Sequence, residues 1–233
     1  MNDITFRQTE PGDKNILLSL SRESIGMTDI FTYVTLHPEL EQTSRLWLGE
    51  NGGFVCVCYD DGSYITQNDL TTGQFIAARS VKGVSVFDTP KKKHRLEVME
   101  YHRENIPPSE NTVPLTGKDI ISALRLMSGE EKLPDYLEKR YVDIVRGINT
   151  GLCDYIGIYE NGGLVSCGGI VASNAKYALI GNIFTKKESR GKGLASDIVK
   201  TLVGNATERN LIPILYCEKN MSGFYHSIGF EEK

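Results

Sequence analysis

A glycine-rich turn between an apolar run and a long amphipathic segment is the feature that most constrains the fold of this 233-residue chain. The stretch runs from Asn182 to Ser196 and reads NIFTKKESRGKGLAS. Gly191 and Gly193 remove side chains where the backbone must approach another group, and Arg190 adds positive charge. The turn opens a helix whose first N–H groups have no internal partner and carry the positive end of the helix dipole. The segment therefore predicts an anion site, suited to a phosphate-bearing ligand.

Hydrophobic periodicity sets this turn inside an α/β pattern. A strand at 113–116 and helices at 119–127 and 134–148 are followed by three closely spaced strands at 154–159, 164–171 and 177–184. After the turn, apolar residues recur every four positions from Leu194 to Ala206, which predicts an amphipathic helix. A strand at 212–217 and a short helix around 224–228 complete the pattern. Residues 1–110 are predicted only as mixed α/β.

Composition excludes several classes of function. A net charge of −4 argues against bulk attraction to nucleic acid or to an anionic membrane. No leader sequence or membrane span is predicted, so we expect a cytoplasmic protein, monomeric or homodimeric. Five cysteines without CxxC spacing predict reduced core thiols, and four scattered histidines predict no metal site.

The segment Ile106–Glu110, which contains two prolines, is the best candidate domain boundary. It predicts an N-terminal domain at 1–110 and a C-terminal domain at 111–233. The sequence ENGGFVC at 50–56 is echoed by ENGGLVS at 160–166, which raises the hypothesis of a tandem duplication. The basic run 91–95 is interpreted as a solvated face.

Spacing separates three interpretations of the glycine turn. A Walker A loop requires glycine at position 186 and Ser or Thr after a Gly-Lys pair, and Lys186 and Gly193 stand there instead. A dinucleotide fingerprint fits Gly191-x-Gly193-x-x-Ser196 with Glu218 as ribose acceptor. Only 15 residues follow Glu218, however, where that fold needs further βα units.

The third interpretation is the pattern Arg-x-x-Gly-x-Ala, present as Arg190-Gly-Lys-Gly193-Leu-Ala195. It resembles the acetyl-coenzyme A loop of the GNAT N-acetyltransferase superfamily. The order of elements over residues 112–233 resembles that family as well, and Phe224-Tyr-His-Ser-Ile-Gly-Phe230 looks like its ending. The resemblance implies a GNAT fold, a mixed and mostly antiparallel sheet flanked by helices, with the N-terminal half a degenerate GNAT-like α/β unit in tandem.

The resemblance also implies acetyl-coenzyme A as the acetyl donor and assigns residues to it. The strands at 177–184 and 212–217 would splay apart to admit the pantetheine arm, and the turn would hold the pyrophosphate. The implied binding residues are Ile183, Phe184, Thr185, Arg190, Gly191, Lys192, Gly193, Leu194, Ala195, Ser196 and Asn220.

The implied reaction is direct attack of a primary amine on the acetyl thioester in a ternary complex. By resemblance, the backbone N–H of Ile183 would stabilise the oxyanion and Tyr225 would act as general acid. No general base stands out, since Asp154 and Glu160 only flank a neighbouring strand, so we expect ordered water to take the proton. The acceptor is a small-molecule amine or a peptide, which the sequence does not identify further.

Two alternatives remain open at this stage. The missing base favours a non-catalytic coenzyme A-binding or sensing module, and the fingerprint leaves a nicotinamide dinucleotide-binding protein as a remote alternative. In the N-terminal half, residues 79–83 stand at the offset of the glycine turn but lack its second small residue. We therefore hypothesise that this half has lost its ligand loop, packs on the catalytic half and shapes the acceptor cleft.

Overall fold

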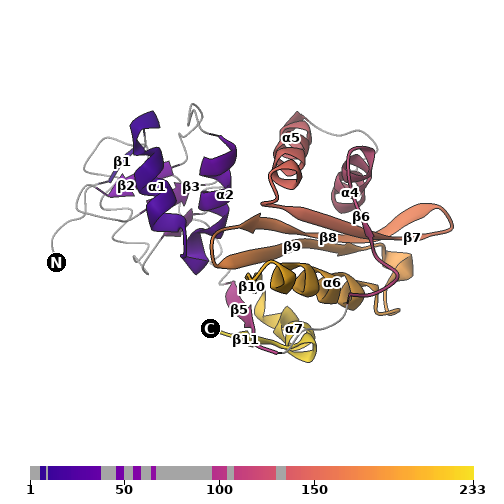
Figure 1. Ribbon diagram of the computed structural model, residues 1–233. Coiled ribbons are helices and arrows are strands. Elements are labelled where there is room, and N and C mark those ends of the chain that lie inside the picture. The colour runs from indigo at the N-terminus through magenta and orange to yellow at the C-terminus, as the bar shows by residue number, and fades with distance from the viewer. Residues whose placement is uncertain are drawn as a thin grey trace. The chain divides into compact units, whose positions relative to one another are not determined.

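The computed structural model describes residues 6–8, 10–37, 46–49, 55–58, 64–66, 96–103, 108–129 and 135–233. Its contacts divide the chain into two compact units, Met1–His94 and Arg95–Lys233. Each unit contains its own sheet (Figure 1).

The N-terminal unit combines a small sheet with two short helices. Its strands form a four-stranded antiparallel sheet in chain order: β1 (Phe6–Gln8), β2 (Leu46–Gly49), β3 (Val55–Cys58) and β4 (Tyr64–Thr66). The 3-10 turns η1 (Pro11–Asp13) and η2 (Ile25–Met27) precede α1 (Lys14–Ser21) and α2 (Thr28–Leu36). The helices bury a small apolar core, made of Leu17, Met27, Ile30 and Val34. The unit is mixed α/β, as predicted.

The C-terminal unit is built on a seven-stranded sheet with the order β11-β5-β10-β9-β8-β7-β6. The strands are β5 (Glu97–Tyr101), β6 (Val113–Pro114), β7 (Asp154–Glu160), β8 (Gly163–Ser173), β9 (Tyr177–Thr185), β10 (Ile212–Cys217) and β11 (Phe230–Glu232). Only β9 and β10 are parallel neighbours among these described strands, and the other pairs are antiparallel. The predicted mixed, mostly antiparallel sheet is confirmed.

Helices cover both faces of this sheet (Figure 1). One face carries α4 (Lys118–Ser128) and α5 (Asp135–Asn149), and the other carries α6 (Leu194–Glu208). The short helix α7 (Ser222–Ile228) precedes β11. The predicted apolar stripe of α6 is buried, with Ile198, Leu202 and Ala206 fully inaccessible. Every helix and strand predicted between residues 113 and 228 is confirmed in type.

Gly168 lets β8, β9 and α6 approach one another. A Cβ atom added at Gly168 would lie 2.4 Å from Cδ1 of Ile183 in β9 and 2.6 Å from Cγ2 of Ile198 in α6. Such distances are far inside van der Waals contact, so a larger residue would push the helix or the strand away. The glycine thereby fixes the helix that follows the turn against the strand that precedes it.

Strand β5 joins the C-terminal sheet from residues that the sequence analysis assigned to the N-terminal domain. It lies between β10 and β11, pairing with Ile214–Cys217 on one side and with Phe230–Glu232 on the other. The sheet of the second unit therefore requires residues upstream of 111. The proposed division at 110/111 stays a prediction about independent folding, but it cuts β5 from its sheet.

Four predicted features lie outside the described residues in whole or in part. They are the echo at 50–54, the segment 79–83, the basic run 91–95 and the first proline of the 106–110 segment. The degenerate GNAT-like character of the N-terminal half consequently stays a prediction.

Candidate functional site

Strands β9 and β10 are paired over only part of their length. The parallel register joins Ile212, Pro213 and Ile214 to residues 177–179, and no further pair joins these two fully described strands. Strand β9 nevertheless continues along β8 as far as Thr185. The two strands are therefore not paired with each other at residues 180–185 of β9 and 215–217 of β10. This is the divergence expected from the resemblance.

The edge of β9 offers backbone groups on the side away from β8. The N–H of Lys186 donates to the carbonyl of Val165, 2.9 Å away, so the backbone groups of residue 186 face β8. Because backbone groups alternate in direction along a strand, those of Thr185 and Ile183 face away from β8. The carbonyl of Thr185 accepts a hydrogen bond from Nε of Arg190 at 3.1 Å.

A bulge distorts β9 beside this edge. Gly181 pairs with Gly169 and Phe184 with Cys167, so Asn182 and Ile183 together face one residue of β8. Asn182 has φ of 57°, a left-handed conformation that asparagine tolerates better than other non-glycine residues.

Side chains from α5 and β7 hold this bulge. Oδ1 of Asn182 accepts a hydrogen bond from Nη2 of Arg140 at 2.8 Å, and its Nδ2 donates to the hydroxyl of Tyr155 at 2.6 Å. Tyr155 is buried, and burial raises the pKa of its phenol well above the usual range. Sequence analysis did not single out Arg140 or Tyr155; an asparagine within an apolar strand was the available signal, because asparagine is depleted in strands.

The glycine turn has the backbone geometry of an anion site. A 3-10 turn, η4 (Lys187–Ser189), leads into it, and both Gly191 (φ 79°) and Gly193 (φ 84°) are left-handed. A Cβ at either glycine would meet no atom within 4 Å, so the backbone is open on that side. The carbonyl of Gly193 accepts the first helical hydrogen bond, from the N–H of Asp197. The N–H groups of residues 194–196 precede that bond and are the helix's orphan donors.

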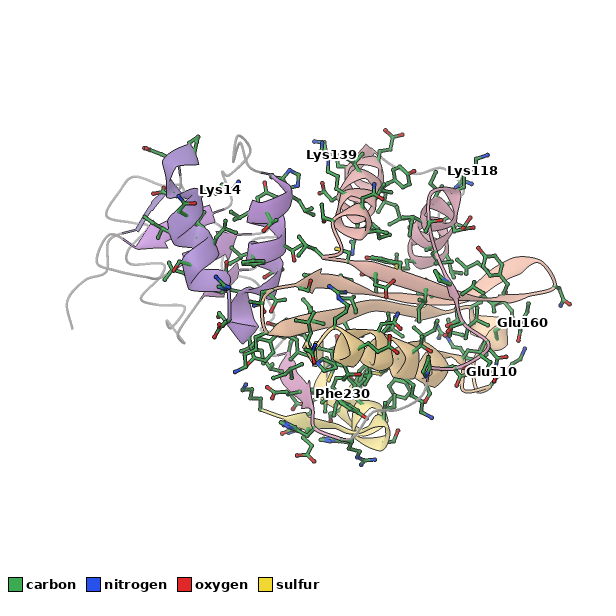
Figure 2. All side chains as sticks on the ribbon, in the orientation of Figure 1. Lys14, Glu110, Lys118, Lys139, Glu160 and Phe230 are labelled. Carbon is green, nitrogen blue, oxygen red and sulfur yellow. The ribbon has the colours of Figure 1, made fainter. Side chains whose placement is uncertain are left out.

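The lysine of the turn is paired with a protein carboxylate. Nζ of Lys192 lies 3.0 Å from both carboxylate oxygens of Glu160, and Oγ of Ser189 donates to the same carboxylate at 3.1 Å. Lys192 lowers the pKa of Glu160 chiefly by hydrogen bonding, and Ser189 adds to this effect. Glu160 ends β7 where the hairpin to β8 begins (Figure 2). The ion pair of Glu160 and Lys192 therefore connects this hairpin to the glycine turn.

Tyr225 lies on α7, on the sheet face that α6 covers. Its ring is partly buried, with centroids 5.0 Å from Phe224 and 6.1 Å from Phe230. Burial raises the pKa of the Tyr225 phenol, and the neighbouring thiol of Cys217 raises it further. The phenol therefore stays protonated at neutral pH and can donate a proton. Asn220 is exposed within η5 (Lys219–Met221), ahead of the same helix.

The three cysteines whose side chains are described do not form reactive sites. Cys153, Cys167 and Cys217 are free and buried. Burial raises the pKa of Cys153 and of Cys167 to about 12, so neither is a thiolate at neutral pH.

Comparison with known proteins identifies the class of the domain. Residues 152–232 match the family model described as the acetyltransferase (GNAT) domain. The matched range contains β7 to β10, the glycine turn, α6 and α7. Residues 152–232 thus match the GNAT acetyltransferase family. No curated protein matches the chain in sequence.

Three solved structures are similar to this chain. An acetyltransferase of the GNAT family from Colwellia psychrerythraea is 14% identical, with a TM-score of 0.59 over 98% of this chain and 96% of that chain. A predicted acetyltransferase from Clostridium acetobutylicum, solved with acetyl-CoA, is 22% identical, with a TM-score of 0.45 over 53% of this chain and 90% of that chain. A GNAT-family structure from Novosphingobium aromaticivorans is 18% identical, with a TM-score of 0.45 over 60% of this chain and 61% of that chain. The fold assignment rests on the Colwellia structure, because a TM-score below 0.5 does not define a fold.

None of the helices in the described ranges is long and apolar enough to cross a membrane.

Proposed function

We propose that this protein transfers an acetyl group from acetyl-coenzyme A to a primary amine. The observation that carries the proposal is the unpaired edge of β9 where it diverges from β10, leading directly into a glycine turn and the orphan amides of α6. This arrangement lies within a domain of an acetyltransferase family. Either feature alone would also suit a simple phosphate site, and their succession along one strand supports the proposal of a coenzyme A site.

The backbone offers acetyl-coenzyme A two kinds of contact. Pantetheine amides would pair with the edge of β9 at Ile183 and Thr185, in the manner of an added strand. The pyrophosphate would lie against the amides from Gly191 to Ser196, where two glycines leave the backbone open. Arg190 would reach it through the guanidinium nitrogens other than Nε, which bonds Thr185.

The chemistry requires a neutral amine, a donor for the oxyanion and an acid for the departing sulfur. The N–H of Ile183, on the free edge of β9, is our candidate donor. Tyr225, which burial keeps protonated, is our candidate acid. The amine nitrogen bonds the acetyl carbon and the carbon–sulfur bond breaks. The thiolate takes the phenolic proton, and a proton lost from nitrogen restores the phenol.

Two measurements on the full chain test the proposal. The first is thermal unfolding with acetyl-coenzyme A, coenzyme A or NAD, because a ligand that binds only the folded state raises the Tm. The second is thiol release from acetyl-coenzyme A with a panel of amino acids, polyamines, aminoglycosides and peptides with free amines.

We expect acetyl-coenzyme A to raise the Tm, NAD to leave it unchanged and at least one amine to release thiol. Stabilisation by acetyl-coenzyme A without release on any amine would favour a binding or sensing module instead. Stabilisation by NAD alone would favour a dinucleotide-binding protein.

A further inference from the structure

Arg140 on α5 carries a positive charge that the described part of the chain does not neutralise. Its side chain is exposed, and its Nη2 donates to Oδ1 of Asn182, a neutral amide, at 2.8 Å. Lys192 and Lys233, by contrast, each pair with a glutamate, and no carboxylate in the described ranges pairs with Arg140. A guanidinium has five N–H donors in a fixed fork, so one hydrogen bond leaves most of them available.

The groups that position Arg140 are themselves uncharged. Nδ2 of Asn182 donates to the hydroxyl of Tyr155 at 2.6 Å. Burial raises the pKa of the Tyr155 phenol, and the nearby charge of Arg140 lowers it by less, so the phenol stays neutral at physiological pH. The chain of hydrogen bonds through Arg140, Asn182 and Tyr155 therefore orients the guanidinium without cancelling its charge.

This charge lies close to the atoms proposed to take part in the reaction. Asn182 directly precedes Ile183, whose N–H is the candidate oxyanion donor. Only covalent bonds of Asn182 and one hydrogen bond of 2.8 Å separate the backbone nitrogen of Ile183 from Nη2 of Arg140, so these two atoms are at most about 10 Å apart. An amine that attacks an acetyl group held at Ile183 and an anion bound to Arg140 can thus belong to one small molecule.

Strand β9 is accessible to solvent where Arg140 contacts it. The first half of β9 is largely buried, but residues 181–185 all keep partial exposure, although the strand lies inside a seven-stranded sheet with helices on both faces. The side chain of Ile183 packs on the α6 face, where its Cδ1 and Cγ2 of Ile198 lie on either side of Gly168. That of Asn182 contacts α5 instead, so we expect an acceptor to approach from the side of α5.

We propose that Arg140 binds a carboxylate of the acceptor, so that the substrate is an amino acid or another small amine that carries its own carboxylate. The inference rests on the proposed transferase function and narrows its acceptor. A guanidinium fork matches a planar carboxylate with two parallel hydrogen bonds, which fixes the orientation of the molecule that carries it. Polyamines and aminoglycosides have no anion to offer, and their charge is repelled by the same guanidinium.

Matched pairs of amines that differ in the anion alone test the inference. Thiol release by the full chain is measured with amino acids and with their carboxamides, in which the carboxylate is replaced by a neutral group. O-phosphoethanolamine and ethanolamine ask the same question of a phosphate. The ammonium of a carboxamide loses its proton more readily, because no neighbouring carboxylate stabilises it. A preference for the amino acids therefore cannot come from the reactivity of the amine.

For the natural chain we expect kcat/KM to be at least about tenfold higher for the preferred amino acid than for its carboxamide, in the range of a hydrogen bond between charged groups. In Arg140→Gln this ratio should fall by about 10- to 100-fold, mainly through KM for the amino acid, with the Kd of acetyl-coenzyme A unchanged. Both amines are measured on one preparation, so the ratio does not depend on the fraction of folded protein.

Two further variants on α5 separate the fork from the charge. Arg140→Lys keeps the charge but not the fork, and we expect it to retain part of the preference. Lys139→Gln removes an exposed charge one residue away (Figure 2) and should leave the ratio unchanged.

A ratio that Arg140→Gln leaves unchanged, with both values of kcat/KM falling in parallel, would mean that Arg140 only supports the bulge of β9, and it overturns the inference. A natural chain that uses amino acids and carboxamides equally, or that prefers only the phosphate-bearing amine, overturns the carboxylate while the transferase function stands. A natural chain that releases no thiol with any amine overturns both together.

Discussion

At the scale of single residues, Gly193 is the sharpest test of the anion site. Its φ of 84° strains any side chain, and it caps the helix whose orphan amides would hold the pyrophosphate. Gly193→Glu adds a negative charge at that point, and we expect acetyl-coenzyme A to bind at least about tenfold more weakly, a cost of about 1.4 kcal/mol in binding. Isothermal titration calorimetry measures this loss.

Gly129 provides the matched control for backbone strain. It has φ of 73°, ends α4, and like Gly193 would place a Cβ with no atom within 4 Å. Gly129→Glu introduces the same side chain under similar strain but away from the turn. Equal affinities for the two variants would contradict the anion site.

Tyr225 makes a second prediction at this scale. Tyr225→Phe keeps the ring that contacts Phe224 and Phe230, so we expect an unchanged Tm. Turnover should fall by about 10²-fold, since the phenolic proton is lost, with the Kd of acetyl-coenzyme A unchanged. Steady-state turnover measured as a function of pH provides a second test of this role.

The sign of that pH dependence follows from the raised pKa of the phenol. Burial favours the neutral form, so the acid is present at neutral pH and is lost only above the usual pKa of about 10 for tyrosine. The natural protein should therefore show no loss of turnover attributable to Tyr225 between pH 7 and that value. A Tyr225→Phe variant as active as the natural chain would mean that the ring is only a core anchor.

At the scale of elements, the hairpin that links β7 and β8 contacts the glycine turn through the ion pair of Glu160 and Lys192. Glu160→Gln removes a negative charge beside the turn and frees the ammonium of Lys192. We expect acetyl-coenzyme A to bind about two- to fivefold more tightly at low salt, in the range of a surface ion pair, with the gain shrinking as salt rises.

The Kd of acetyl-coenzyme A, measured for both proteins at two salt concentrations, tests this prediction. Weaker binding by Glu160→Gln would show instead that the ion pair is needed to shape the turn.

Sequence reasoning was most successful for elements whose signals are local. The helix α6 follows from an apolar spacing of four after a glycine, and the β7–β8 hairpin from Asn161-Gly162, whose left-handed φ values of 51° and 77° suit those residues. The edge of β9 that is not paired with β10 could be inferred only through the resemblance, because it depends on where the pairing of the two strands stops.

Strand β5 could not be predicted from the sequence, because its signals are not local. Its five residues carry glutamates at both 97 and 100, which obscures the alternation of a half-buried strand. Its partners, β10 and β11, lie near the other end of the chain, so only tertiary contacts define it.

At the scale of the whole molecule, strand order decides where the chain can be shortened. A chain beginning at residue 111 loses β5 and leaves β10 and β11 without the strand between them. Without β5, the edges of β10 and β11 and the apolar side chains that Met99 covers would be exposed. We therefore expect the shortened chain to be unfolded or to aggregate. A chain of residues 95–233 retains the complete sheet, and we expect it to unfold cooperatively by circular dichroism and to bind acetyl-coenzyme A.

That shortened chain also tests what the N-terminal unit contributes. All the residues proposed to hold acetyl-coenzyme A, together with Tyr225, lie within 95–233, so the Kd for acetyl-coenzyme A should equal that of the full chain. If the N-terminal unit helps to shape the acceptor cleft, KM for the amine should rise or turnover should fall while that Kd stays constant. Full turnover by residues 95–233, at an unchanged KM for the amine, would show that the N-terminal unit does not shape the acceptor site.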